Sequence, residues 1–207
     1  MSAPKPKAVT APLFYFIRHG ETDWNVERRL QGSRDIPLNG RGRRQSAQCG
    51  DTLRSLIEEG GRTPADFTYV SSPLLRASET MDIVRGALGL PDAGYVTDPR
   101  LAELSFGRWE GRTYKEIGAV DRVALKIRDR DRWNHRPPDG ESYADLLVRL
   151  RAWHDGITGN VVVTAHGGVA RAVMVMFGVR TTAEVPRGDI EQGVVFEFAP
   201  GAMKKHY

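Results

Sequence analysis

Residues 13–22 read Leu-Phe-Tyr-Phe-Ile-Arg-His-Gly-Glu-Thr. The apolar run at their start is rich in aromatic and β-branched side chains, which predicts a buried strand of about five residues. Arg18 and His19 follow where that strand ends. A permanently charged guanidinium beside an imidazole that titrates near neutrality suits a phosphate pocket better than a core. Gly20 then predicts a sharp turn at which nearby N–H groups face an anion.

A second stretch of the same character lies far along the chain, where residues 160–168 read Asn-Val-Val-Val-Thr-Ala-His-Gly-Gly. It predicts another β-branched strand, ended by a histidine and a glycine. Alone, an Arg-His pair at a strand end is typical of a solvated loop. Two such ends in a parallel sheet lie at the same edge, which is where these folds bind ligands. We therefore expect His19 and His166 to lie close together.

Length and composition indicate one soluble domain. The chain has 207 residues, 40% of them hydrophobic, which is enough for one substantial core. We expect a flexible tail over residues 1–11 and a single domain over residues 12–207. No apolar run approaches the roughly 20 residues of a membrane span, and the start lacks the apolar block of a secretory signal. The single cysteine, Cys49, excludes an internal disulfide. These features predict a cytoplasmic protein with no membrane partner.

The charge balance favours anionic partners. The formal net charge is +4 and the isoelectric point is about 9.4. The arginines are scattered among acids rather than collected in one run with interleaved aromatics, which argues against a nucleic-acid partner. Asp129 and Asp131 superficially resemble a metal-binding pair. Because arginines flank both of them, we expect a salt-bridged surface instead, and no metal.

Strands alternate with helices along the chain. This order predicts a three-layer α/β/α sandwich with a mostly parallel central sheet. Besides the two strands above, we expect strands at 67–70, 95–96 and 194–198, and helices at 39–59, 72–88, 113–133, 141–153 and 168–177. Leu75 is expected to point inward from the second helix, whereas Val120, Val123 and Ile127 form a thin apolar stripe on the third. The long polar loop over residues 23–38 is expected to be functional.

Two further segments carry chemically suitable side chains. Residues 71–77 read Ser-Ser-Pro-Leu-Leu-Arg-Ala and would place Arg76 in the first turn of a helix, near the same sheet edge. Glu103 lies in an apolar segment punctuated by glycines, whereas Glu110 is expected to be a solvated or helix-capping acid. Removing a phosphoryl group without a metal requires fixed cations, an aligned nucleophile and a proton donor. Arginine, histidine and glutamate side chains supply these roles.

Together the four stretches 13–22, 71–77, 101–111 and 160–168 resemble the histidine phosphatase superfamily, also called phosphoglycerate mutase-like. The resemblance implies that His19 is the nucleophile that becomes phosphohistidine, and that Glu103 is the general acid and later the general base. It implies a phosphate pocket formed by Arg18, Arg76 and His166. Substrate contacts are implied for Thr22, Asn25, Gln31, Gly32 and Gly167.

Residues 104–111, which follow Glu103, resemble the small phosphatase branch and lack the His-Tyr-Gly pattern of the glycolytic mutases. The predicted function is therefore metal-independent hydrolysis of a phosphate monoester, with no cofactor and with a small phosphorylated metabolite as the partner. Two alternatives stay open. One is a phosphoglycerate mutase, and the other is a phospho-ligand-binding module with weak turnover. The sequence names neither the alcohol group of the substrate nor the oligomeric state.

Overall fold

The computed structural model describes residues 12–184 and 190–207, so the predicted tail at 1–11 lies outside the described residues. Within this part the strands form a six-stranded sheet with the order β3-β2-β4-β1-β5-β6. The strands are β1 (Phe14–Arg18), β2 (Thr68–Ser71), β3 (Val96–Thr97), β4 (Val161–Ala165), β5 (Val195–Ala199) and β6 (Ala202–His206). The pairings from β3 through β1 are parallel, and β5 and β6 are antiparallel additions at one edge. The expected mostly parallel sheet is confirmed.

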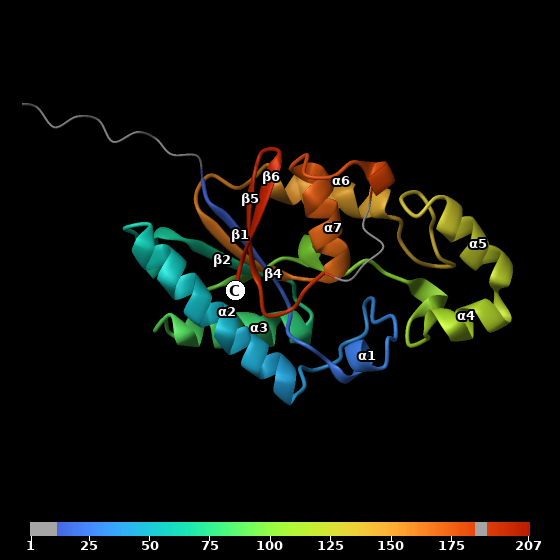
Figure 1. Ribbon diagram of the computed structural model, residues 1–207, viewed down its shortest axis with the longest axis horizontal. Helices are drawn as coiled ribbons and strands as arrows, with labels where there is room; N and C mark the ends of the chain where they lie inside the picture. Colours follow the sequence, from blue (N-terminus) through green and yellow to red (C-terminus); the bar gives the residue numbers. More distant parts are fainter. Residues whose placement is uncertain (1–11, 185–189) are drawn as a thin grey trace, which may run out of the picture.

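Helices cover both faces of the sheet, as expected for a three-layer sandwich. They are α1 (Asp23–Val26), α2 (Gly40–Glu59), α3 (Leu75–Ala87), α4 (Tyr114–Val120), α5 (Arg122–Arg130), α6 (Tyr143–His154) and α7 (Gly167–Met176). Figure 1 shows α2 and α3 toward the bottom of the view, and α6 and α7 to the right of the strands. The predicted starts of α2 and α6 are confirmed, because the side chains of Asn39 and Ser142 cap these helices by accepting backbone N–H groups.

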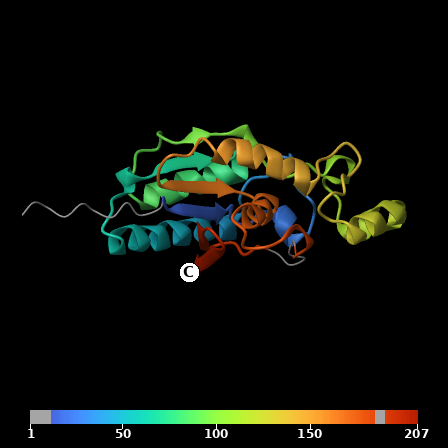
Figure 2. The same cartoon turned by 90° about the horizontal axis from the view of Figure 1, so that it is seen from above.

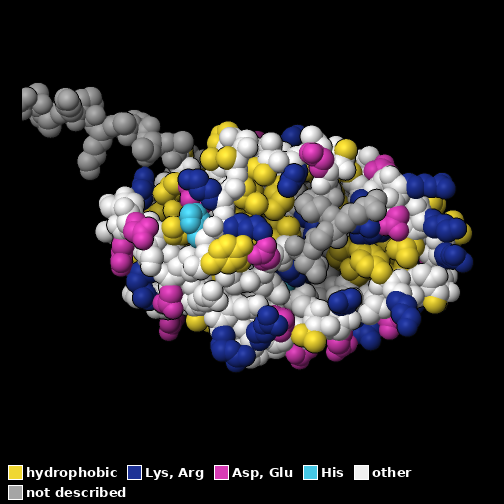
Figure 3. Space-filling view, in the orientation of Figure 1, with side chains coloured by type: hydrophobic (Ala, Val, Ile, Leu, Met, Phe, Trp, Pro, Cys, Tyr) yellow, Lys and Arg dark blue, Asp and Glu magenta, His cyan; other side chains and the backbone are white. Residues whose placement is uncertain are grey.

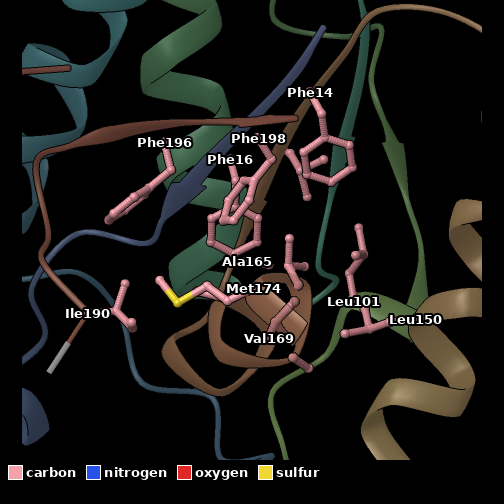
Figure 4. Packing of buried hydrophobic residues seen from close by; sticks show 14 of the residues in the cluster. Phe14, Phe16, Leu101, Leu150, Ala165, Val169, Met174, Ile190, Phe196 and Phe198 are labelled. Carbon is pink, nitrogen blue, oxygen red and sulfur yellow. The ribbon is translucent and has the colours of Figure 1, made fainter. Parts of the chain in front are cut away.

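The alternation of side chains along β1 explains why two cores form. Phe14 and Phe16 point into the core beneath α6 and α7, where Figure 4 shows aromatic and aliphatic side chains in contact. Tyr15 and Ile17 point to the opposite face and pack against α2 and α3. Successive residues of a strand face opposite sides of the sheet, so a fully apolar strand supplies both cores. This double burial fixes β1, and with it the position of His19.

The charged region between residues 113 and 133 contains two short helices rather than one long one. Asp121 ends α4 and caps α5, and its backbone departs from helical geometry. Figure 2 shows α5 (yellow) projecting beyond the end of the sheet. The predicted apolar stripe is not buried, since Val120, Val123 and Ile127 are 69%, 70% and 52% exposed. No helix among the described residues is long and apolar enough to cross a bilayer.

The beginning of α3 differs from the prediction. The helix starts at Leu75, with Leu74 rather than Ser72 at the cap position, and the side chain of Leu75 is 44% exposed instead of buried. The hydroxyl of Ser72 is engaged elsewhere, because its oxygen lies 2.7 Å from Nε2 of His166. The serine and proline that resemble a helix start therefore belong to the turn that leads from β2 to the helix.

Candidate active site

The two histidines lie side by side at the carboxyl ends of neighbouring parallel strands. Arg18 is in register with Ala165, and the next backbone N–H, that of His19, donates to the Ala165 carbonyl at 2.9 Å. The rings of His19 and His166 are 5.2 Å apart between centroids. Both side chains are buried, at 2% and 0% exposure. The expectation that the two motifs meet at one sheet edge is confirmed.

The contacts of His19 determine which ring nitrogen carries a lone pair. Nδ1 of His19 lies 2.7 Å from the carbonyl oxygen of Gly20. Because a carbonyl only accepts, Nδ1 carries the proton and Nε2 is left with its lone pair. Burial, together with the charges of Arg76 and Arg18, lowers the pKa of His19 well below its usual range. The imidazole is therefore neutral at physiological pH.

Gly20 has a different role from the one predicted. Its N–H donates to Oγ1 of Thr80 at 3.1 Å and so does not face an anion. A Cβ atom at Gly20 would lie 2.2 Å from the carbonyl oxygen of Gly42, at the start of α2. The glycine is needed because the backbone after β1 passes directly against this helix.

His166 precedes the first residue of α7 and contacts Ser72, for which the sequence predicted only a helix-capping role. Nε2 of His166 lies 2.7 Å from Oγ of Ser72, and this oxygen also accepts the N–H of Leu74 at 3.3 Å. Nδ1 of His166 is buried and has no hydrogen-bond partner in the described ranges. Burial lowers the pKa of His166 well below its usual range, and the charges of Arg76, His19 and Arg18 add to the effect. Nε2 of His166 is thus held by Ser72, and Nδ1 is available to a ligand.

The side chain of Arg76 is fully buried, so Arg76 is not an exposed helix arginine, which its spacing alone would equally allow. Its Nη1 donates to the carbonyl of Arg34 at 2.7 Å, and its Nη2 donates to the carbonyl of Gly32 at 2.9 Å. Its Nε is buried without a hydrogen-bond partner among the described residues. Arg18, at the end of β1, donates from Nη1 to the carbonyl of Ile190. Both guanidiniums are therefore oriented by backbone carbonyls, and both lower the pKa values of the two histidines.

Glu103 lies in the loop that follows a 3-10 turn at Pro99–Leu101. Its carboxylate accepts the N–H of Leu104 at 2.9 Å and the N–H of Gly168 at 3.1 Å. Gly168 is the second residue of α7, so the carboxylate lies at the positive end of this helix. A Cβ atom at Gly168 would lie 2.4 Å from Oε1 of Glu103, which explains the glycine. Glu103 also acts electrostatically on Arg76, which places it beside the pocket.

The residues predicted to contact the substrate make different hydrogen bonds within the protein. Thr22 is fully buried and caps α1, with its Oγ1 accepting the N–H of Asn25 at 3.2 Å. Oδ1 of Asn25 in turn accepts the N–H of Thr22 and the side-chain amide of Gln192 at 3.1 Å each. Gln31 is 7% exposed, and its Oε1 has no partner within the described ranges. The structure therefore gives Thr22 a capping role and brings Asn25 to the pocket through Gln192, which also donates to the carbonyl of His19 at 3.0 Å.

Gly32 and Gly167 each lie beside one of two buried or partly buried arginines. Gly32 adopts a φ of +52°, and its carbonyl is one of the two that hold Arg76. Gly167 opens α7, and a Cβ atom there would lie 3.5 Å from Nε of Arg18. Both predicted residues are thus next to the pocket arginines.

The prediction that Glu110 is a solvated or helix-capping acid is wrong. Its side chain is 6% exposed rather than solvated. It accepts hydrogen bonds from the N–H of Ser33 at 3.0 Å and from the N–H of Phe106 at 3.1 Å, and the hydroxyls of Ser33 and Ser105 donate to it as well. Glu110 therefore joins the loop that carries Gly32 to the segment after Glu103. No local pattern in the sequence signals this long-range contact.

The other acids do not form a metal centre. In residues 12–184 and 190–207 there is no group of three or more histidine, cysteine, aspartate or glutamate side chains that could hold an ion. Asp129 accepts from Arg132 at 2.8 Å, and Asp131 accepts from the backbone of Asn134 at 3.0 Å. The expected ion pairing is confirmed for Asp129, whereas Asp131 acts through hydrogen bonds.

A neutral imidazole beside two oriented guanidiniums is typical of sites that bind and transfer phosphoryl groups. The chain belongs to the histidine phosphatase superfamily (branch 1), whose family model matches residues 14–198. The family resemblance inferred from the four motifs is therefore confirmed.

Relatives and solved structures in this family carry names from two reaction classes. A 2,3-bisphosphoglycerate-dependent phosphoglycerate mutase 2 from Gloeobacter violaceus is 30% identical over 193 residues, which cover 90% of this chain and 84% of that protein. A probable phosphoglycerate mutase from an Enterobacter species is 35% identical over 138 residues, and the match covers 67% of this chain but only 59% of that protein. A mycobacterial glucosyl-3-phosphoglycerate phosphatase has a TM-score of 0.74 at 28% identity, with 90% of this chain and 89% of that chain covered.

Proposed function

We propose that this protein hydrolyses phosphate monoesters of small metabolites through a covalent phosphohistidine on His19. The observation that carries this proposal is the 2.7 Å contact between Nδ1 of His19 and the Gly20 carbonyl, which puts the ring proton on Nδ1 and leaves a lone pair on Nε2. A lowered pKa keeps this imidazole neutral, and a neutral imidazole is a nucleophile toward phosphorus. Covalent catalysis then divides one difficult displacement into two easier ones.

Three side chains are suited to hold the phosphoryl oxygens. Arg18 and Arg76 supply fixed positive charge, and His166 supplies a ring nitrogen. Nε of Arg76 and Nδ1 of His166 are buried without hydrogen-bond partners in the described part of the chain, and phosphoryl oxygens are suitable acceptors for them. A donor of this kind, positioned before the reaction, typically contributes a factor of roughly 10²–10³ to the rate.

Glu103 is proposed as the proton donor and later the base. In the first step Nε2 of His19 bonds to phosphorus, the ester P–O bond breaks, and Glu103 gives its proton to the leaving oxygen. In the second step water attacks phosphorus, its proton passes to Glu103, and the P–N bond breaks to release phosphate. Together the two steps return His19 and Glu103 to their starting states. The observation that supports this role is the proximity of Glu103 to Arg76 and to the first turn of α7, which begins directly after His166.

The guanidiniums of Arg18 and Arg76 supply the positive charge that a phosphoryl group needs, so we propose that no metal takes part. Guanidinium groups bind the phosphoryl oxygens bidentately, the role that Mg²⁺ plays in many other phosphatases. We expect turnover to persist unchanged in excess chelator. Loss of activity that added Mg²⁺ restores would contradict this part of the proposal.

A phosphoglycerate mutase activity is the second candidate, and the names of the sequence relatives favour it. Incubation with 3-phosphoglycerate, followed by ³¹P NMR, distinguishes the two reactions. A phosphatase accumulates inorganic phosphate, whereas a mutase accumulates the 2-phospho isomer. Phosphate release from phenyl phosphate, measured in the same preparation, supports hydrolysis independently of phosphoglycerate recognition. Ligand binding without either product would indicate the third alternative, a phospho-ligand-binding module.

A further inference from the structure

The short segment before β5 contacts three groups around the phosphate pocket. The carbonyl of Ile190 accepts a hydrogen bond from Nη1 of Arg18. Two residues further on, Nε2 of Gln192 donates to the carbonyl of His19 at 3.0 Å and to Oδ1 of Asn25 at 3.1 Å. The proposed steps of the reaction use no atom of Gln192, so these two hydrogen bonds call for a separate explanation.

This segment is held on both of its sides. The side chain of Ile190 is 5% exposed and packs into the core beneath α6 and α7. The side chain of Glu191 points the other way, where it pairs with Lys205 of β6 and accepts from the hydroxyl of Tyr207 at 3.0 Å. Figure 3 shows Lys and Arg side chains next to Asp and Glu side chains around the end of β6. The backbone that carries Gln192 is therefore fixed.

The partners of the two amides determine which way each amide points. A carbonyl oxygen only accepts, so the atom of Gln192 beside the His19 carbonyl is the NH₂ nitrogen. A backbone N–H only donates, so the atom of Asn25 that lies 3.1 Å from the nitrogen of Thr22 is the oxygen, Oδ1. The contact between Gln192 and Asn25 thus joins a donor to an acceptor, in the one orientation that suits both amides.

The donors around Asn25 leave its nitrogen as the end of the amide that a ligand can meet. Oδ1 accepts from the N–H and from the hydroxyl of Thr22 and from Nε2 of Gln192, at 3.1 Å each. Nδ2 of Asn25 has no hydrogen-bond partner among the described residues, and the residue is only half-buried. An anion that approaches this side chain therefore meets two N–H donors and no acceptor.

We propose that Gln192 is a positioning residue, which holds Asn25 so that Nδ2 donates to an oxygen of the phosphoryl group. This inference rests on the proposed function, because it assumes that the phosphoryl group lies at His19. The last torsion of an asparagine is broad and roughly two-fold, so an amide with fewer restraints turns its oxygen toward the anion for part of the time. Because Gln192 also bonds to the His19 backbone, it fixes this amide relative to the nucleophile.

Calorimetric titration with inorganic phosphate tests the inference without turnover. Gln192→Met keeps the length of the side chain but removes its donor, and Asn25→Ala removes the amide that Gln192 holds. We expect the dissociation constant of phosphate to rise roughly two- to tenfold in Gln192→Met, the range for one neutral hydrogen bond. It should rise roughly tenfold in Asn25→Ala, which loses a hydrogen bond to a charged group. In the Asn25→Ala background, Gln192→Met should have almost no further effect.

Gln45→Met is the matched control for this double-mutant cycle. A Cβ atom placed on Gly193 would lie 3.4 Å from Cγ of Gln45, so Gln45 packs against the same segment. Its Oε1 accepts the N–H of Glu21 at 2.9 Å, and it makes no hydrogen bond to Asn25 among the described residues. Any effect of Gln45→Met on phosphate affinity should therefore be the same with and without the Asn25 side chain.

The NMR signals of the Asn25 side-chain amide supply a readout that a merely structural role would not change. The two amide protons should shift when inorganic phosphate is added to the wild-type protein, and the shift should be smaller in Gln192→Met. This measurement on the wild-type protein stands even if a variant does not fold.

An unchanged phosphate affinity in Gln192→Met or Asn25→Ala, or amide protons of Asn25 that phosphate does not shift, would overturn the inference. An effect of Gln192→Met that persists in full without the Asn25 side chain would also overturn it, and would indicate a packing role. If phenyl phosphate is not hydrolysed while the coupling and the shift are observed, the proposed function fails and the positioning role remains. If inorganic phosphate does not bind to the wild-type protein, both fail.

Discussion

His19 and His166 differ in the partner of one ring nitrogen. This difference in partner supports different proposed roles for the two rings, as nucleophile and as hydrogen-bond donor. The Gly20 carbonyl accepts only, so it fixes the proton of His19 on Nδ1. The Ser72 oxygen accepts the N–H of Leu74 with one lone pair, and its hydroxyl proton remains available for Nε2 of His166. Donation from this hydroxyl to Nε2 leaves the proton of His166 on Nδ1, which faces no protein partner in the described residues. These tautomers support the proposed roles, in which His19 attacks phosphorus with its lone pair and His166 donates an N–H to a phosphoryl oxygen.

Ser72 is therefore a positioning residue, and its removal should weaken phosphate binding. We expect Ser72→Ala to raise the inhibition constant for inorganic phosphate or vanadate roughly tenfold, the effect of one lost hydrogen bond to a buried ring. The ¹⁵N shifts of His166 should also lose the signature of a single tautomer. Ser71→Ala is the control, since Ser71 is equally buried but bonds only to the Ser72 carbonyl and to Thr164. Equal effects of the two variants would indicate a packing defect instead.

A substitution of Glu103 distinguishes the proposed proton transfer from phosphate binding. Glu103→Gln preserves size but removes the transferable proton, so we expect hydrolysis of an alkyl phosphate to fall by roughly 10²–10⁴. An aryl phosphate with a good leaving group needs little protonation, so its first step should slow much less. The phosphoenzyme should then accumulate, because water still lacks its base. Rapid-quench kinetics with both substrates measure this. Equal losses without an accumulated intermediate would remove the proton-transfer role from Glu103.

Among the elements, the loop between α1 and α2 is fixed from two directions. The carbonyls of Gly32 and Arg34 orient Arg76, and Glu110 holds the adjoining Ser33. A Cβ atom at Gly32 would lie 2.1 Å from Oε1 of Glu110, so the loop and the carboxylate are in direct contact. The position of the Arg76 guanidinium therefore depends on the conformation of this loop. Glu110 affects the pocket indirectly, because it holds the loop in place.

This arrangement predicts opposite outcomes for two substitutions of Glu110. Glu110→Gln keeps an oxygen that accepts the N–H groups of Ser33 and Phe106, so kcat/KM should change by only a few fold. Glu110→Ala removes the hydrogen bonds to Ser33 and Phe106 and should lower both stability and phosphate affinity, by about 0.5–1.5 kcal/mol in stability for each bond lost. Denaturant unfolding and phosphate inhibition measure the two effects. Loss of turnover in Glu110→Gln with normal stability would mean that Glu110 transfers protons.

The elements that the sequence predicted well are those with strong local signals. The strands ending at Arg18 and Ala165 are continuous apolar runs, and Asn39 marks the start of α2. The missed strand, β6 at Ala202–His206, contains two lysines and lies at the sheet edge, where pairing to β5 decides its conformation. Likewise, Gln192 and Glu110 reach the pocket through contacts distant in sequence, and no periodicity or motif encodes these.

The order of the strands in the sheet brings His19 and His166 together. β1 and β4 are central neighbours, and the short segment after each strand carries a histidine. Helices on both faces bury these strands, so the histidines at their ends are desolvated along with them. The same burial that stabilises the fold therefore keeps both imidazoles neutral, and it links the stability of the protein to pH.

The direction of this pH dependence follows from the lowered pKa values. Between the folded pKa values and the unfolded value near 6.5, the unfolded chain binds protons that the folded chain does not. The free energy of unfolding should therefore be fully maintained above pH 6.5 and should fall below it, by up to about 1.4 kcal/mol per pH unit for each histidine. Denaturant titrations from pH 7.5 to 5.5 measure the slope. His19→Gln should be less pH-dependent, and an unchanged slope would contradict the burial argument.

In the proposed mechanism His19 carries the phosphoryl group during turnover. Trapping this phosphohistidine is the direct test of the mechanism. The protein is mixed with phenyl phosphate, quenched in alkali within milliseconds and analysed by mass spectrometry of its peptides and by ³¹P NMR. We predict one acid-labile, base-stable phosphoryl group on Nε2 of His19, formed at a rate at least equal to kcat and absent from His19→Ala. A phosphoryl group on another residue, or steady hydrolysis by His19→Ala at the wild-type rate, would contradict this mechanism.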